Sequence, residues 1–186
     1  MTAENRRGRW KLPGMLEADK YSVVELLRDG RRIEIRSLKP DDRDDFIAAV
    51  NRTSSQSLYR RFFAAKRGFT EQEVAFFLNV DFVNHVALVA VLEGGERSVV
   101  GGGRYVVVQP GKAEVAFVVV DQYQGQGIGA ALMRHLIAIA HEAGIKQLIA
   151  EILPDNHAML KIFRKTGLRL TTRRESQVVH VALQLA

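Results

Sequence analysis

Residues 113–132 read AEVAFVVVDQYQGQGIGAAL and contain glycine at every second position of a short loop. The three glycines, Gly125, Gly127 and Gly129, follow a continuous apolar run and precede an apolar segment with helical spacing. A strand that enters a glycine-rich turn and then a helix presents several backbone N–H groups at the start of the helix. Because such N–H groups bind phosphate oxygens, this stretch predicts an anion-binding loop.

Two kinds of nucleotide-binding loop fit these glycines. The spacing Gly-x-Gly-x-x-Ala from Gly125 to Ala130 matches a dinucleotide-binding fingerprint, with Glu151 as its ribose-binding acid. That fingerprint follows the first strand of a parallel sheet, whereas here three strand-like runs precede it and only 57 residues follow Gly129 (186 minus 129). The context therefore excludes the dinucleotide-binding fold and favours the alternative pattern Gln-x-x-Gly-x-Gly, from Gln124 to Gly129.

Length, charge and composition limit the possible functions. The chain has 186 residues, no cysteine and a net charge of +6. The length suits one domain, and the lack of cysteine excludes disulfides, thiolate metal sites and a catalytic thiol. The positive charge favours an anionic partner such as a phosphate-bearing molecule. Since no apolar run of about eighteen residues occurs and the N-terminus lacks an apolar block, we expect a soluble, cytoplasmic protein without membrane contact.

The first half of the chain predicts an arm, a hairpin and two helices. We assign residues 1–20 to a flexible basic arm and residues 21–186 to a single domain. Asp29-Gly30 between two apolar runs predicts a hairpin turn. Pro40 starts a helix through about Val50, with a continuation across residues 57–63 left open. The capping-box spacing of Thr70 and Glu73 predicts a second helix over residues 71–80.

The second half of the chain predicts a mixed sheet. Three β-branched runs, over residues 87–93, 98–108 and 113–120, predict an antiparallel meander. A helix over residues 130–144 ends on a glycine, and a strand, a helix and a final strand pair follow it: residues 146–153, 157–167, 168–173 and 178–185. The fold class is therefore α/β, with a mixed sheet flanked by helices.

The loop and its surroundings resemble the GNAT superfamily of acetyl-CoA-dependent N-acetyltransferases. Gln124 to Gly129 resembles motif A, which cradles the pyrophosphate of coenzyme A, and Asn156 to Met159 with Phe163 and Thr166-Gly167-Leu168 resembles motif B. The resemblance covers roughly residues 33–185. Several segments also resemble the catalytic domain of bacterial Pat-type protein lysine acetyltransferases: LRDGRRIEIRSLKPDD, SLYRRFF, ALVAV, AEVAFVVVDQYQGQGIG and EILPDNHAML.

This resemblance implies a mostly antiparallel sheet that is splayed at the acetyl-CoA site. It implies that acetyl-CoA contacts the end of one strand, the glycine loop and motif B. The residues concerned are Phe117, Val118, Val119, Gln124, Gly125, Gln126, Gly127, Ile128, Gly129, Ala130, Asn156 and Phe163. Arg134 and Lys161 are further candidates for the phosphates, although cations on a helix surface are more often simply solvated.

Glu114 is the first candidate for a catalytic base. A lysine amine, with a pKa of about 10.4, is almost fully protonated at pH 7, so its attack on a thioester needs a base. The resemblance places the general base of Pat-like and histone-type members at Glu114. We expect Val115, Phe117 and Val119 to surround it with apolar groups and raise its pKa. The alternative is a solvated glutamate at a strand end that has no catalytic role.

Glu151 is the second candidate, inside the apolar strand LIAEIL. Other GNAT members also have glutamate at this position and sometimes use it as a base, but it can equally orient the substrate or serve the structure. Phe163 stands where many members have a tyrosine that protonates the leaving thiolate. Solvent or another group must then supply that proton, although an alkyl thiol with a pKa of about 8.5 leaves acceptably without help.

The sequence therefore predicts direct acetyl transfer from acetyl-CoA to a lysine of a protein, such as an acyl-CoA synthetase. Two alternatives stay open: a GNAT enzyme that acetylates a small amine, and an acyl-CoA-binding module without turnover, which Phe163 favours. Five scattered histidines predict no metal site, and we interpret His85 as structural. The basic arm lacks a nucleic-acid-binding module, so we expect no nucleic-acid partner. The sequence determines neither the acyl-chain preference nor the oligomeric state.

Overall fold

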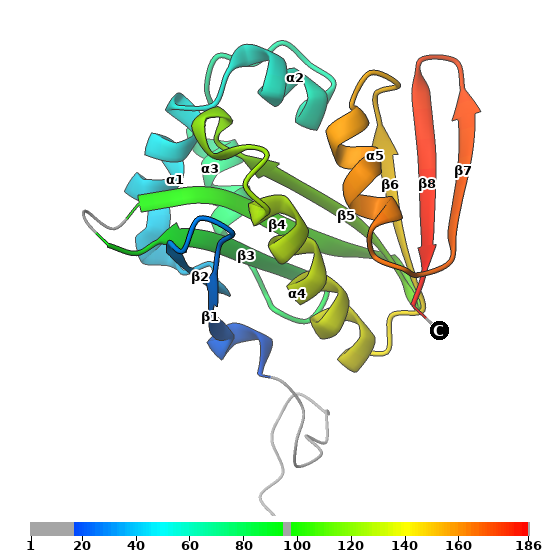
Figure 1. Ribbon diagram of the computed structural model, residues 1–186, viewed down its shortest axis with the longest axis horizontal. Coiled ribbons are helices and arrows are strands. Elements are labelled where there is room, and N and C mark those ends of the chain that lie inside the picture. Colours follow the sequence, from blue (N-terminus) through cyan, green and yellow to red (C-terminus); the bar gives the residue numbers. More distant parts are fainter. Residues whose placement is uncertain (1–16, 95–97, 186) are drawn as a thin grey trace, which may run out of the picture.

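The structure is a computed structural model that describes residues 17–94 and 98–185 (Figure 1). Eight strands form one sheet in the order β1-β2-β3-β4-β5-β6-β8-β7, in which β5 and β6 are parallel and all other neighbours are antiparallel. The strands are β1 (Ser22–Leu26), β2 (Arg32–Ser37), β3 (His85–Leu92), β4 (Ser98–Gln109), β5 (Lys112–Val119), β6 (Gln147–Ile152), β7 (Leu170–Glu175) and β8 (Val178–Gln184). The predicted mixed sheet is confirmed.

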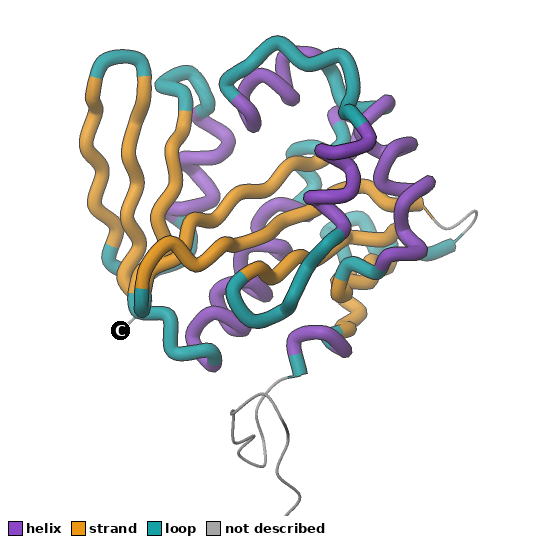
Figure 2. Tube along the Cα trace, turned by 180° about the vertical axis from the view of Figure 1, so that it is seen from behind, coloured by secondary structure: helices purple, strands orange, loops and turns teal. Residues whose placement is uncertain are grey.

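Helices cover both faces of the sheet. Those in the described ranges are α1 (Arg43–Asn51), α2 (Ser55–Phe62), α3 (Glu71–Leu78), α4 (Ile128–Glu142) and α5 (His157–Arg164), with 3-10 turns at Ala18–Lys20, Pro40–Asp42 and Asp121–Tyr123. Helices α4 and α5 lie on the face seen in Figure 1, and α1, α2 and α3 lie on the face seen in Figure 2. Each face has a hydrophobic core: the larger one is under α4 and α5, and a smaller one is under α1 and α3.

The predicted turns and helices are largely present. The hairpin between β1 and β2 closes where Leu27 N–H donates to Arg31 O at 2.8 Å, and the Thr70–Glu73 capping box starts α3. The open question of one long first helix is settled by a break, because the Ser54 side chain accepts from Ser57 N–H and starts α2 separately. Helix α4 begins at Ile128, two residues earlier than predicted.

The sheet parts between β5 and β6. The two strands pair only over Lys112↔Gln147, Ala113↔Leu148 and Glu114↔Ile149. Beyond these pairs β6 continues along β8, and β5 continues along β4. Figure 1 shows β5 and β6 diverging, with α4 and α5 in front of the gap. The predicted splay of the sheet is therefore present at the end of the strand that leads into the glycine loop.

A buried ion pair joins β2 to the turn before α1. Arg36 donates to both carboxylate oxygens of Asp42 at 2.7 Å, and Lys39 N–H donates to the same carboxylate at 2.7 Å. Burial alone would raise the pKa of Asp42, but these hydrogen bonds outweigh it and hold the pKa below its ordinary value. Arg36 is 9% exposed and Asp42 is 5% exposed, so these hydrogen bonds balance two buried charges. A second carboxylate, Glu34, lies farther from Arg36, at 3.9 Å from its Nε.

Most of the predicted basic arm, residues 1–16, lies outside the described residues. Its last part, residues 17–20, packs on the domain, because Ser37 Oγ donates to Ala18 O. Within the described ranges no helix is both long enough and apolar enough to cross a membrane.

Candidate functional site

A cavity of about 980 Å³ opens where the sheet parts. Its walls come from the end of β5, the glycine loop, the first turns of α4, helix α2 and helix α5. Ten of the twelve predicted cofactor-binding residues line it: Phe117, Val118, Val119, Gln124, Gly125, Gly127, Ile128, Gly129, Ala130 and Asn156. Segments far apart in the sequence thus meet around one elongated space.

The glycine loop is shaped for a bulky anion. Gly125 and Gly127 have φ values of +75° and +96°, a conformation that side chains other than glycine's disfavour. A Cβ added at either position would meet no atom within 4 Å, so the space in front of the loop is open. Because Gly127 is also the N-cap of α4, the free N–H groups of the first helical turn lie at the cavity wall.

Hydrogen bonds to α2 hold the loop in place. The Asp121 carboxylate accepts from Ser54 N–H, Ser54 Oγ and Ser57 Oγ at 2.7, 2.7 and 2.8 Å. These donors outweigh burial and lower the pKa of Asp121. Gln124 donates to Val119 O at 3.0 Å and to Ser57 Oγ at 3.1 Å, which ties the loop to the end of β5. The geometry of the loop therefore depends on α2 as well as on its glycines.

Two residues predicted to contact the cofactor do not line the cavity. Phe163 is 1% exposed and packs beside Phe117, with ring centroids 6.3 Å apart, because it lies on the face of α5 that meets the sheet. The Gln126 side chain is directed away, where it accepts from Arg31 and donates to Gln122 O at 3.0 Å. The loop is thereby connected to the hairpin between β1 and β2.

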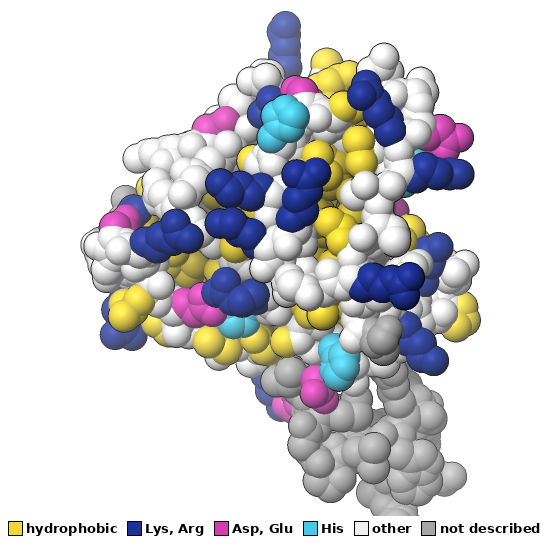
Figure 3. Space-filling model, turned by 45° about the vertical axis from the view of Figure 1, so that its right-hand side comes forward, with side chains coloured by type: hydrophobic (Ala, Val, Ile, Leu, Met, Phe, Trp, Pro, Cys, Tyr) yellow, Lys and Arg dark blue, Asp and Glu magenta, His cyan; other side chains and the backbone are white. Residues whose placement is uncertain are grey.

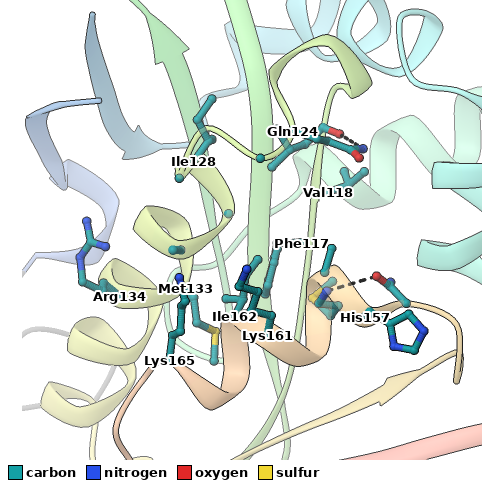
Figure 4. Close-up of a pocket in the computed structure, with 18 of the residues that line it drawn as sticks. Phe117, Val118, Gln124, Ile128, Met133, Arg134, His157, Lys161, Ile162 and Lys165 are labelled. Atoms are coloured by element: carbon teal, nitrogen blue, oxygen red, sulfur yellow. Dashed lines mark hydrogen bonds between the residues drawn. The ribbon is translucent and has the colours of Figure 1, made fainter. Parts of the chain in front are cut away.

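Six cationic side chains line the cavity, and none of its lining residues is acidic. They are Arg28, Arg60, Arg61, Arg134, Lys161 and Lys165. Figure 3 shows Lys and Arg side chains around a hollow with exposed hydrophobic groups, and Figure 4 shows Arg134 on α4 with Lys161 and Lys165 on α5. The sequence analysis considered only two of these cations. The other four were missed because they belong to α2, to the hairpin turn and to the end of α5, which sequence spacing does not bring together.

Two of these arginines have partners that fix their position. Arg134 donates to Glu25 at 2.6 Å, and Arg60 Nη2 donates to Asp155 at 3.1 Å. The Nε atom of Arg60 is buried without a hydrogen-bond partner among the described residues.

Asn156 caps helix α5 and also lines the cavity. It is 9% exposed and its Oδ1 accepts from Met159 N–H at 3.2 Å, which caps the N-terminus of α5. The cap orients the helix whose cations and apolar side chains form one side of the cavity, as Figure 4 shows.

Glu114 lies where β5 and β6 part, opposite Ile149 in the last residue pair. The expected apolar surround is wrong. Side chains alternate along a strand, so Val115 and Phe117 are buried under α4, whereas Glu114 is exposed on the opposite face. Its charged neighbour is Arg61 of α2, whose protonated form Glu114 favours electrostatically.

Glu151 lies on the same face of the sheet as Glu114, because it is two residues beyond Ile149 on β6. It is exposed and faces His180 of β8, with 3.4 Å between Glu151 Oε1 and His180 Nδ1. In Figure 2 the end of the sheet with β6, β8 and β7 has no helix in front of it on this face. Both candidate carboxylates are therefore accessible from the side opposite α4.

His85 is a partner of Arg104, as expected for a structural histidine. Arg104 Nη1 lies 2.9 Å from His85 Nε2, and Phe76 stacks on the imidazole with ring centroids 5.7 Å apart. Burial and the neighbouring guanidinium lower the pKa of His85, so the neutral ring accepts a hydrogen bond from Arg104. Among the residues described, no group of three or more His, Asp or Glu side chains is arranged to hold a metal ion.

Comparison of sequences identifies relatives of the chain. Residues 53–168 match the acetyltransferase (GNAT) family. The chain is 35% identical to acetyltransferase PA5475 of Pseudomonas aeruginosa over 146 residues, which is 77% of each chain. It is also 35% identical to acetyltransferase Pat of Mycolicibacterium smegmatis over 145 residues, 76% of this chain and 42% of Pat.

Comparison with solved structures supports the same family. The GNAT domain of S. lividans PAT superimposes with a TM-score of 0.80 at 33% identity, covering 88% of this chain and 96% of that domain. The protein yncA of Salmonella typhimurium, solved with acetyl-CoA, has a TM-score of 0.65 at 20% identity over 83% of this chain and 94% of its own, which indicates a shared fold. The predicted similarity to Pat-type domains is confirmed. The chain belongs to the GNAT family of acetyltransferases and is an N-acetyltransferase.

Proposed function

We propose that the chain transfers an acetyl group from acetyl-CoA in the cavity to a lysine amine of a protein, with Glu114 as the general base. The observation that carries this proposal is the composition of the cavity wall. A glycine loop at a helix N-terminus and six cations, without a carboxylate among the lining residues, suit a ligand with several phosphates.

The cavity suits coenzyme A in its other features too. Its apolar wall, which includes Phe117, Ile128 and Met133, suits the pantetheine arm. At Phe117–Val119 the side of β5 that faces β6 has no strand partner, so its backbone groups are available to an extended amide-containing chain. When bound, acetyl-CoA supplies an activated thioester.

Three features of Glu114 support its assignment as the general base. It lies at the parting of β5 and β6, on the face that is open to a second substrate, and Arg61 of α2 offsets part of its charge. Glu151 lies on the same face with its Oε1 3.4 Å from His180 Nδ1, which favours a role in orienting the acceptor. The proton of the amine goes to Glu114. Phe163 has no proton to donate, so solvent or another group protonates the thiolate that leaves.

The face of the sheet that carries Glu114 and Glu151 favours a protein over a small amine as the acetyl acceptor. An acetyltransferase for a small amine is expected to enclose it in an acidic pocket. Here Glu114 and Glu151 are exposed, and a smaller cavity on the same face of the sheet is lined by arginine, threonine, glycine and apolar residues without an acidic residue. A lysine side chain on the surface of a folded protein can reach such an exposed carboxylate.

The release of coenzyme A thiol from acetyl-CoA, measured with a panel of protein lysines and small amines, tests this function. We expect turnover with at least one protein, such as an acyl-CoA synthetase, and acetyl-lysine on that protein by mass spectrometry. Turnover with small amines alone would make the chain an acetyltransferase for small molecules. Tight binding of coenzyme A without any turnover would instead indicate an acyl-CoA-binding module.

The glycine loop gives a separate prediction about coenzyme binding. Gly127→Ala forces a side chain into the φ of +96°, at a cost of about 1–2 kcal/mol, so the loop should shift its N–H groups. We expect the KM for acetyl-CoA to rise about tenfold. Gly144→Ala is the matched control, because Gly144 has a φ of +78°, open space around its Cβ and a position at the far end of α4. An equal rise in KM for both variants would contradict the assigned role of the loop.

A further inference from the structure

A second, small cavity lies on the face of the sheet that carries Glu114. Its volume is about 70 Å³, and it is enclosed by β4, β5 and helices α1, α2 and α3. Gly102 and Val118 form part of its floor, and Phe62 and Phe77 form part of its wall. Arg61 and Val118 line this cavity as well as the large one, so the two spaces adjoin at the end of β5.

Arg104 reaches this cavity from β4. It stands opposite Ala116 of β5, on the same face of the sheet as Glu114. Its guanidinium stacks over Phe77 with 4.5 Å from Cζ to the ring centroid, and its Nη1 contacts Phe77 O at 3.3 Å and His85 Nε2 at 2.9 Å. These partners are neutral, so they orient the guanidinium without balancing its charge.

Arg61 reaches the cavity from α2. Its guanidinium lies over the Phe62 ring, with 4.6 Å from Cζ to the centroid. It forms neither a hydrogen bond nor an ion pair with any residue in the described ranges, although the charge of Glu114 acts on it. An arginine has five N–H donors, so most of the hydrogen-bonding capacity of Arg61 is unused.

Both arginines are cations in poorly solvated surroundings. Burial lowers the pKa of Arg61 to about 10 and the pKa of Arg104 to about 9, and the charge of Arg61 contributes to the shift at Arg104. Both therefore remain protonated at pH 7. Two like charges that face a low-dielectric cavity without a bound carboxylate are unfavourable, and an anion placed between them would remove much of that cost.

We propose that the acceptor carries a carboxylate close to its reactive amine, and that Arg61 and Arg104 bind this carboxylate while the amine faces Glu114. This inference rests on the proposed function and adds the class of acceptor: a lysine with an acidic neighbour. A volume of about 70 Å³ corresponds to roughly two water molecules at about 30 Å³ each, which suits the end of an acidic side chain. The planar guanidinium groups match the geometry of a carboxylate.

Peptides that differ in one residue test this inference. The reactive lysine is flanked by Asp in one peptide and by Asn in the other, and kcat/KM is measured for the wild type, Arg61→Gln, Arg104→Gln and Arg67→Gln. We expect the wild type to prefer the Asp peptide about tenfold, and each cavity variant to lose most of this preference. Arg67 is exposed and lines neither cavity, so Arg67→Gln loses the same charge and should keep the preference.

A conservative variant distinguishes loss of carboxylate binding from loss of folding. A second set of acceptors distinguishes failure of this inference from failure of the proposed function. Arg61→Lys should retain part of the preference, which loss of folding would not allow. Free amino acids and their amides are assayed in parallel. If the wild type prefers the free amino acids to their amides and the Arg61 and Arg104 variants do not, the inference is supported even if the peptides are inert. Equal losses on the Asp and Asn peptides would overturn it, because Arg61 would then only support Glu114. A preference for succinyl-CoA that disappears in Arg61→Gln would overturn it too, since the cavity would then bind the acyl group.

Discussion

Replacing Glu114 by glutamine is expected to lower kcat for acetyl transfer by about 10²–10⁴-fold, the range that general acid–base catalysis contributes. The glutamine keeps the size and hydrogen-bonding reach of the side chain but cannot accept the proton of the amine. The KM for acetyl-CoA should change little, because Glu114 is not among the residues that line the large cavity. Thiol release at saturating acetyl-CoA, together with calorimetric binding of coenzyme A, measures the two effects separately.

The pH profile distinguishes loss of a base from general damage to the site. A lysine amine becomes neutral without help as the pH approaches its pKa of about 10.4, so the Glu114→Gln variant should regain activity as the pH rises. Glu151→Gln is the comparator, and we expect a loss of less than about tenfold since it removes an orienting group. A larger loss in Glu151→Gln than in Glu114→Gln would reverse the assignment of the base.

Asp42→Asn should have the largest effect on stability, with a decrease of about 3–5 kcal/mol in the free energy of unfolding. The amide cannot balance the charge of Arg36, whose side chain is only 10% exposed and whose other carboxylate neighbour, Glu34, is farther away, at 3.9 Å from Arg36 Nε. Urea unfolding followed by circular dichroism at pH 7 measures the change. Asp44→Asn is the matched control, because the Asp44 side chain is 97% exposed and its loss should cost no more than about 0.5 kcal/mol.

The ion pair between Arg36 and Asp42 also predicts that the stability of the fold depends on pH. The hydrogen bonds from Arg36 and Lys39 hold the pKa of Asp42 below its ordinary value of about 4. A carboxyl group with a lowered pKa stabilises the fold above its unfolded pKa, and this contribution is lost as the pH falls through the folded pKa. The difference between the wild type and Asp42→Asn should therefore shrink below pH 4. A difference that persists unchanged at low pH would argue against the ion pair as its cause.

Much of the fold and of the coenzyme side of the site was predictable from local sequence. The glycine loop, the capping box and the β-branched runs each encode their conformation in a few adjacent residues, and the structure confirms them. The family resemblance added the splay between β5 and β6. The resemblance to motifs A and B predicted that Gln124 and Asn156 lie in the cavity wall, where the structure has them.

The parts that were not predictable depend on contacts between distant segments. Nothing in the sequence near Arg61 indicates that α2 turns its cations toward β5, because SLYRRFF reads equally well as an ordinary surface helix. The surroundings of Glu114 were predicted wrongly because its sequence neighbours point to the other face of the strand. The prediction for Phe163 did not take account of which side of α5 meets the sheet.

The parting of β5 and β6 gives this sheet a pair of open edges in its interior. An open strand edge ordinarily invites the strand of another protein and, with it, aggregation. Here the edge of β5 lies at the bottom of a walled cavity, behind α4 and α5 and among six cations. A narrow, flexible ligand such as a pantetheine arm can enter this cavity. We expect that a strand held in the sheet of another protein is too wide to do so. Under the proposed function, the fold therefore leaves a backbone edge available to acetyl-CoA, while α4 and α5 cover that edge on one face of the sheet.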